Sequence, residues 1–115
     1  MKSEANFELS EGARKGVPVL EVRGEVDVST SPELRDRLAG ISEAGQKVVV
    51  VDLTDVSFVD STALGVLVSG LKRFRSDGGD LRLVVTQPHI AKVFEITGLT
   101  EVFAIYRTSE EAVRA

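Results

Sequence analysis

The residues with the clearest chemical potential are three adjacent polar side chains, Asp60, Ser61 and Thr62, placed directly before a run of helical apolar periodicity. A hydroxyl group at such a position can act as a nucleophile or accept a phosphoryl group. It can also simply cap the helix, since the side chain of Asp60 or Ser61 would accept a hydrogen bond from a free backbone amide and stabilise the helix by about 1 kcal/mol. One cap requires only one such residue, so the cluster indicates a second role.

Hydrolase chemistry is one interpretation of this cluster. Ser61, the single histidine His89, and either Asp60 or Asp55 supply the residue types of a catalytic triad. However, Ser61 lacks the flanking glycines of a nucleophile elbow, and residues adjacent in sequence rarely form a triad. His89 follows Pro88 at the start of a predicted helix, where a surface position is the simpler interpretation. The sequence therefore does not predict an enzyme.

A phosphate-accepting aspartate is a second interpretation. Asp52 ends a predicted strand, as the acceptor of a receiver domain does, and the residues that would assist it are Asp55, Asp60 and Lys72. That architecture begins with a strand and a helix, whereas this chain opens with two strands. No glycine-rich phosphate loop occurs, and without cysteine or a second histidine a metal site would need a cluster of carboxylates. We predict no cofactor and no metal.

Composition limits the class of protein. The 115 residues suit one domain, 1–115, that buries about two-thirds of the surface of its unfolded chain. The 14 basic and 18 acidic side chains give a net charge of -4, which disfavours nucleic acid as a partner. The absence of cysteine, of a signal sequence and of an 18-residue apolar run predicts a cytoplasmic protein without disulfides or membrane insertion.

Alternating strands and helices must position the polar cluster. We predict strands at about 6–11 and 17–27, a helix from Ser31 to about residue 43, a strand at 47–53, a helix from Ser61 or Thr62 to about residue 77, a strand at 81–85, a helix from Pro88 to about residue 97, a strand at 102–106 and a helix at 109–115. This order predicts an α/β fold with a mostly parallel mixed sheet of about five strands, an N-terminal hairpin and about four helices.

Three local features support these boundaries. Four consecutive valines at 48–51 are typical of a strand covered on both faces. Residues 54–60 are predicted to form a loop that leads to the second helix, and Ser109 is predicted to cap the last helix. The buried stripe of the second helix is predicted to consist of Leu64, Leu67, Val68, Leu71 and Phe74.

The segment 52–65, DLTDVSFVDSTALG, resembles the signature of the anti-sigma factor antagonists, the small bacterial STAS-domain proteins. The likeness extends over nearly the whole chain. Segment 24–27 (GEVD) resembles the family's segment after the second strand, 78–81 (GGDL) its glycine turn, and 94–99 (FEITGL) its helix-ending block. The resemblance implies a STAS-like fold.

The resemblance also implies a function and a partner. In that family the first hydroxyl residue after the signature aspartate is phosphorylated by an anti-sigma factor that is also a serine/threonine kinase, and this position corresponds to Ser61, with Thr62 as its neighbour. The unphosphorylated chain would bind this partner and release a sigma factor, and phosphorylation would abolish binding. ATP would belong to the kinase, and a phosphatase is a second candidate partner. Ala63 stands where close relatives often carry glycine.

The second helix suggests where a partner would dock. Residues spaced by four, three and four form a face different from the buried stripe, and the small Gly65 would let a partner helix approach closely. The predicted partner-binding residues are Asp27, Asp60, Thr62, Gly65, Val66, Ser69 and Arg73. An ordinary solvated face stays open as an alternative, because a single exposed valine is unremarkable.

A second function shares the same fold. A STAS accessory subunit of a lipid-transporting ABC complex would carry a hydroxyl residue at the same helix start. Such a subunit would co-purify with an ATPase and would tolerate Ser61→Asp.

Overall fold

The computed structural model describes residues 6–115. The elements of this part of the chain are β1 (Phe7–Arg14), β2 (Val17–Val26), α1 (Ser31–Glu43), β3 (Val48–Val59), α2 (Ser61–Ser76), β4 (Asp80–Val84), α3 (Pro88–Ile96), the 3-10 turn η2 (Leu99–Glu101), β5 (Ala104–Tyr106) and α4 (Ser109–Arg114). The predicted α/β fold with five strands and four helices is confirmed. No helix within residues 6–115 is both long and apolar enough to span a bilayer.

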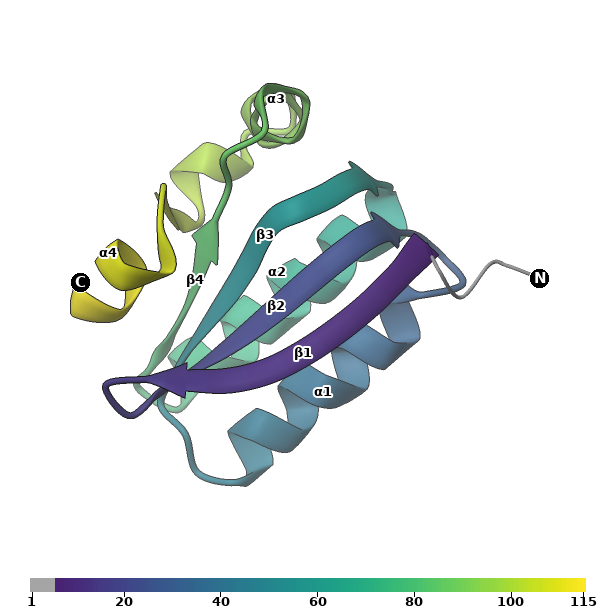
Figure 1. Ribbon diagram of the computed structural model, residues 1–115. Coiled ribbons are helices and arrows are strands. Elements are labelled where there is room, and N and C mark those ends of the chain that lie inside the picture. Colours follow the sequence, from purple (N-terminus) through teal and green to yellow (C-terminus); the bar gives the residue numbers. More distant parts are fainter. Residues whose placement is uncertain (1–5) are drawn as a thin grey trace.

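The five strands form one mixed sheet whose spatial order follows the chain, β1-β2-β3-β4-β5. β1 and β2 form the predicted antiparallel hairpin, and the pairings from β2 to β5 are parallel. Figure 1 shows α1 and α2 side by side on one face of the sheet, while α4 lies on the other. Because each parallel connection passes through a helix, the ends of β2 and β3 meet at the edge where α1 and α2 begin.

The sheet separates a large core from a small one. The large core lies beneath α1 and α2 and includes Val49 and Val51, whereas Val50 belongs to a small cluster that Ala112 of α4 covers. The valines of β3 therefore alternate between two buried faces, which confirms the prediction of a strand covered on both sides. Because β3 is buried on both faces, its end holds the first residue of α2 in a fixed position.

β3 is longer than we predicted, and the loop expected at 54–60 is wrong. The strand continues to Val59 because Val56 and Val59 are buried and pair with Gly24 and Val26 of β2. Irregularities in the β2–β3 register shift the alternation of buried residues, so this segment lacks the regular period of a strand in its sequence.

Side chains from the start of α3 hold the far edge of this longer strand. β4 pairs with β3 only as far as Asp52. Beyond that point Gln87 Nε2 donates a hydrogen bond to the Thr54 carbonyl at 2.7 Å, and His89 Nε2 lies 2.8 Å from the Ser57 carbonyl, to which it donates. These contacts satisfy backbone carbonyls of β3 beyond the end of its pairing with β4.

Two smaller expectations also differ from the structure. Thr108, rather than Ser109, caps α4, since its hydroxyl accepts the Glu111 amide at 3.1 Å. The Ser109 hydroxyl instead donates to the Asp52 carboxylate at 3.0 Å and so ties α4 to β3. On α2, Leu64 and Val68 are half-buried, and the fully buried residues are Ala63, Leu67, Gly70, Leu71 and Phe74.

Candidate functional site

The candidate site is the start of α2, where Asp60 caps the helix and Ser61 is its first residue. Asp60 has an extended backbone, and its Oδ1 accepts a hydrogen bond from the Ala63 amide at 2.9 Å. Ser61 and Thr62 are both exposed. The cap therefore does not use the Ser61 hydroxyl, which is accessible at the helix N-terminus.

Asp60 also joins the start of α2 to the end of β2. Its second carboxylate oxygen, Oδ2, accepts the Val28 amide at 3.1 Å, and its own amide donates to the Val26 carbonyl at 3.2 Å. Both carboxylate oxygens thus have a backbone partner, one in α2 and one in the loop between β2 and α1. The site is built by two segments about 30 residues apart in the chain.

Asp27 stabilises the loop between β2 and α1 by accepting hydrogen bonds from its backbone amides. Its Oδ1 accepts the Ser29 amide at 2.9 Å and the Thr30 amide at 3.1 Å. The Thr30 hydroxyl accepts the Asp27 amide at 2.9 Å and lies 3.0 Å from the Glu25 carbonyl, to which it donates. Asp27 is half-buried, and its carboxylate fixes the loop shape that brings Val28 next to Asp60.

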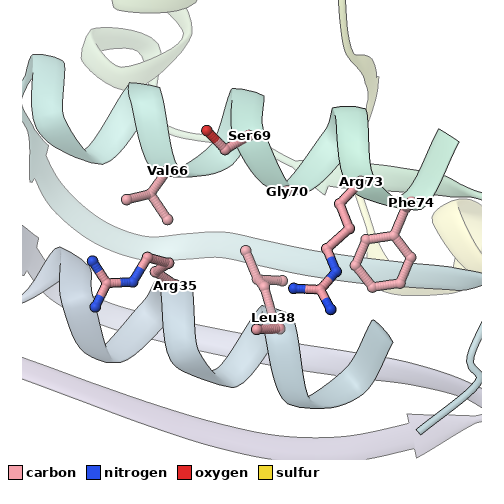
Figure 2. Close-up of a pocket in the computed structure, with 8 residues that line it drawn as sticks. Arg35, Leu38, Val66, Ser69, Gly70, Arg73 and Phe74 are labelled. Carbon is pink, nitrogen blue, oxygen red and sulfur yellow. The ribbon is translucent and has the colours of Figure 1, made fainter. Parts of the chain in front are cut away.

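The predicted docking residues of α2 fall into two groups. Thr62 and Gly65 are exposed on the first turns of the helix, close to Ser61. The other three line a groove of about 90 Å³ between α1 and α2, together with residues of both helices: Arg35, Leu38, Ala39, Val66, Ser69, Gly70, Arg73 and Phe74. Figure 2 shows this groove, with Arg35 and Arg73 at its two ends.

The two helices can approach each other because Gly70 has no side chain at their contact. A Cβ atom at this position would lie 3.1 Å from the Leu38 side chain of α1. Val66, one turn earlier, is therefore half-buried against α1 rather than freely exposed. Arg73 donates a hydrogen bond to the Glu43 carboxylate at 3.3 Å, so one nitrogen of its guanidinium already has a partner within the chain.

The two segments that build the start of α2 are acidic. Segments 24–33 and 54–65 contain five acidic residues and no lysine or arginine: Glu25, Asp27, Glu33, Asp55 and Asp60. Arg23, one residue outside these segments, approaches Asp55 to 4.0 Å in an exposed pair, which contributes little to stability. An additional negative charge on Ser61 would lie next to the Asp60 carboxylate.

The exposed Val28 side chain of this region was not among the predicted site residues. Val28 is 67% exposed in the loop beside Asp60. A single valine between Asp27 and Ser29 matches neither a helix nor a strand pattern, so no sequence signal identifies it.

The geometry supports neither the hydrolase interpretation nor the receiver-type phosphate acceptor. The His89 ring nitrogen Nε2 is bonded to the Ser57 carbonyl, and nothing in residues 6–115 connects the ring to Ser61. Asp52 uses both carboxylate oxygens for Thr54 and Ser109, so it does not form a receiver-type acidic site. Across the described chain, no three acidic or histidine side chains converge in a way that could hold a metal ion. The site is a surface on which the Ser61 and Thr62 side chains are exposed at the start of α2.

Comparison with known proteins identifies the family. The sequence pattern of the STAS domain matches residues 12–112. The chain belongs to the STAS domain family. Within this STAS domain, the match runs from the end of β1 into α4, as the resemblance noted in the sequence predicts. The anti-sigma-B factor antagonist of Bacillus subtilis is 38% identical over 93 residues, which are 81% of this chain and 84% of that protein.

Solved structures agree with this assignment of the fold. An anti-sigma factor antagonist from Mycobacterium paratuberculosis matches this STAS domain with a TM-score of 0.88 and 24% identity, covering 99% of this chain and 97% of that one. SpoIIAA of Bacillus matches in its phosphorylated form (23% identity, 94% of this chain and 96% of that one) and in its unphosphorylated form (21% identity, 94% of each), both with a TM-score of 0.71. The two forms of SpoIIAA therefore resemble this fold equally.

Proposed function

We propose that this STAS domain is an anti-sigma factor antagonist controlled by phosphorylation of Ser61. Its unphosphorylated form binds an anti-sigma factor that is also a serine/threonine kinase, and the bound anti-sigma factor releases a sigma factor. Phosphorylation of Ser61 abolishes this binding. The observation that carries the proposal is the exposed Ser61 hydroxyl at the start of α2, which the Asp60 cap leaves unused.

The fold can accept a phosphate at this position. The group adds about -1.5 to -2 charges near neutral pH. At a helix N-terminus, the free amides and the helix dipole favour an anion by about 0.3 to 1 kcal/mol. Because Asp60 and not Ser61 provides the cap, phosphorylation removes no helix-capping hydrogen bond. We therefore expect modification to leave the folded structure intact.

Binding is affected more strongly than folding. Like charges about 4 Å apart repel by about 1 kcal/mol in water and by about 4 kcal/mol at the effective dielectric of a partly buried surface. A partner that covers the site displaces water from between the phosphate and Asp60, so docking would cost about 3 kcal/mol more per unit charge. Since 1.4 kcal/mol is a factor of ten, the affinity would fall more than a hundredfold.

The relatives support the class of partner. The 38%-identical protein of Bacillus subtilis is named for its antagonism of an anti-sigma factor. SpoIIAA occurs in phosphorylated and unphosphorylated forms that match this fold with the same TM-score. Both points favour a switch that changes surface charge without a large change of fold, and they favour the antagonist over an accessory subunit of a lipid-transporting ABC complex.

The remaining features follow from this role. The chain itself needs no cofactor, because ATP is bound by the kinase. A phosphatase would return the phosphorylated chain to its binding form. Binding an anti-sigma factor places the proposed activity in the cytoplasm, where sigma factors meet RNA polymerase.

The proposal is tested with purified components. Each anti-sigma factor of the source organism that has a histidine-kinase-like ATPase fold is incubated with the chain and ATP, and the product is mapped by mass spectrometry. We expect one phosphate on Ser61, none on the Ser61→Ala variant and an unchanged yield on the control Thr100→Ala, which removes an exposed hydroxyl from η2. Phosphate on Thr62, or no binding to any of these anti-sigma factors, would contradict the proposal.

A further inference from the structure

The exposed apolar side chain of Val28 is held in place by the site itself. Four large apolar side chains among residues 6–115 are more than a third exposed, and two of them lie near Ser61: Val28 at 67% and Phe58 at 49%. Phe58 is three residues before Ser61 and pairs with Glu25 across the β2–β3 ladder. Exposed apolar side chains that are grouped at a functional site make it a candidate protein-binding surface.

The position of Val28 depends on Asp60. Its amide donates to Asp60 Oδ2 at 3.1 Å, while Oδ1 of the same carboxylate caps α2 at Ala63. The turn formed by Asp27 and Thr30 supports the loop from the other side. One carboxylate therefore fixes the distance between the Val28 backbone and the start of the helix that carries Ser61.

The charges near Val28 indicate which kind of protein surface would bind there. A hollow of about 390 Å³ adjoins this loop, and its acidic lining residues are Glu25, Asp27 and Glu33. The two segments around Ser61 contain no lysine or arginine to neutralise these carboxylates. A protein surface that covers both Val28 and this hollow is complementary in charge when it presents lysine or arginine side chains there.

We propose that Val28 is an apolar contact residue for the anti-sigma factor, and that Asp60 is the positioning residue that holds it beside Ser61. The partner surface has an apolar pocket for Val28 with lysine or arginine next to it, over the acidic hollow. This inference rests on the proposed function and specifies which surface the partner covers. The docking surface then lies on the β2–α1 loop as well as on α2.

The first test replaces the apolar side chain. Affinity is measured by isothermal titration calorimetry with the anti-sigma factor that binds the wild-type chain. We expect Val28→Ser to weaken binding by about tenfold or more, with an unchanged melting temperature because the side chain is exposed in the free protein. Ile96→Ser is the matched control, since Ile96 is similarly exposed, at 74%, at the far end of α3. Its affinity should equal that of the wild type.

The second test separates position from charge. Asp60→Asn has one acceptor oxygen, so it can satisfy Ala63 or Val28 but not both. We expect about tenfold weaker binding and faster hydrogen exchange of the Val28 amide or the Ala63 amide, whichever loses its acceptor. Asp55→Asn removes the same charge from β3 without touching the Val28 contact, and it should change affinity less than threefold.

The outcomes distinguish this inference from the proposed function. If the wild-type chain binds none of the anti-sigma factors, both are overturned. If the wild type binds and Val28→Ser binds equally well, only the role of Val28 is overturned. Equal effects of Asp60→Asn and Asp55→Asn would overturn the positioning role of Asp60. Binding that does not weaken as NaCl is raised would overturn the basic partner surface, because salt screens exposed charges.

Discussion

The most informative perturbation is Ser61→Asp, compared with Ser61→Asn. The two side chains have nearly the same size, so their difference isolates one negative charge next to Asp60. In the free protein this charge experiences about 1 kcal/mol of repulsion at 4 Å in water, which the helix dipole offsets by about 0.3 to 1 kcal/mol. The free energy of unfolding of the two variants should therefore agree within about 1 kcal/mol.

In the complex the same pair of charges is partly shielded from water. The repulsion rises to about 4 kcal/mol, so the aspartate variant should bind the anti-sigma factor at least a hundredfold more weakly than the asparagine variant. Calorimetric titration measures the affinities, and urea unfolding measures the stabilities. If the aspartate variant binds within threefold of the asparagine variant, charge does not control docking and the electrostatic reasoning is refuted.

Three further substitutions test the packing around the site. Ser31 is buried at the start of α1, and its hydroxyl has no hydrogen-bond partner within residues 6–115. Ser31→Ala should therefore raise the free energy of unfolding by about 1 kcal/mol. A lower free energy of unfolding, measured by urea denaturation, would contradict this. Gly65→Ala should also stabilise the chain, by about 0.8 to 1 kcal/mol, because the position is exposed within α2 and has open space around it. The same variant should bind the partner more weakly in calorimetry if a helix of the partner approaches Gly65 closely. Gly79→Ala should lower the melting temperature by several degrees in calorimetric scans, since its Cβ would clash with the Lys47 carbonyl, and an unchanged melting temperature would show that the backbone relaxes without cost.

Much of the fold could be predicted from local pattern. The four valines at 48–51 identified the central strand, and Pro32 and Pro88 lie in the first turns of the helices predicted from them. Helical spacing on α2 predicted Leu67, Leu71 and Phe74 in the core. These features depend on interactions within a few residues, which is why a single sequence reveals them.

Features that depend on contacts between distant segments were not predictable in this way. The strand character of 54–59 arises from pairing with β2, with irregular register that breaks the period of two. The role of Ser109 is set by Asp52, 57 residues earlier. At the site, the sequence indicated Ser61 and Asp60, but the second acceptor role of Asp60 toward Val28 is visible only once the β2–α1 loop is placed beside α2.

The order of the strands has a consequence for how the site forms. Because the spatial order of the sheet equals the order along the chain, every strand pairs with its sequence neighbour, and no pairing has to wait for a distant part of the polypeptide. The parallel pairs join residues 22 to 33 positions apart, as in Arg82–Ala104 and Glu25–Phe58. During synthesis from the N-terminus, β1 to α2 leave the ribosome before α3 and α4, so Ser61, Asp60 and Val28 can come together early. Gln87 and His89 are synthesised afterwards, and their side chains then bond to the edge of β3 that β4 leaves unpaired.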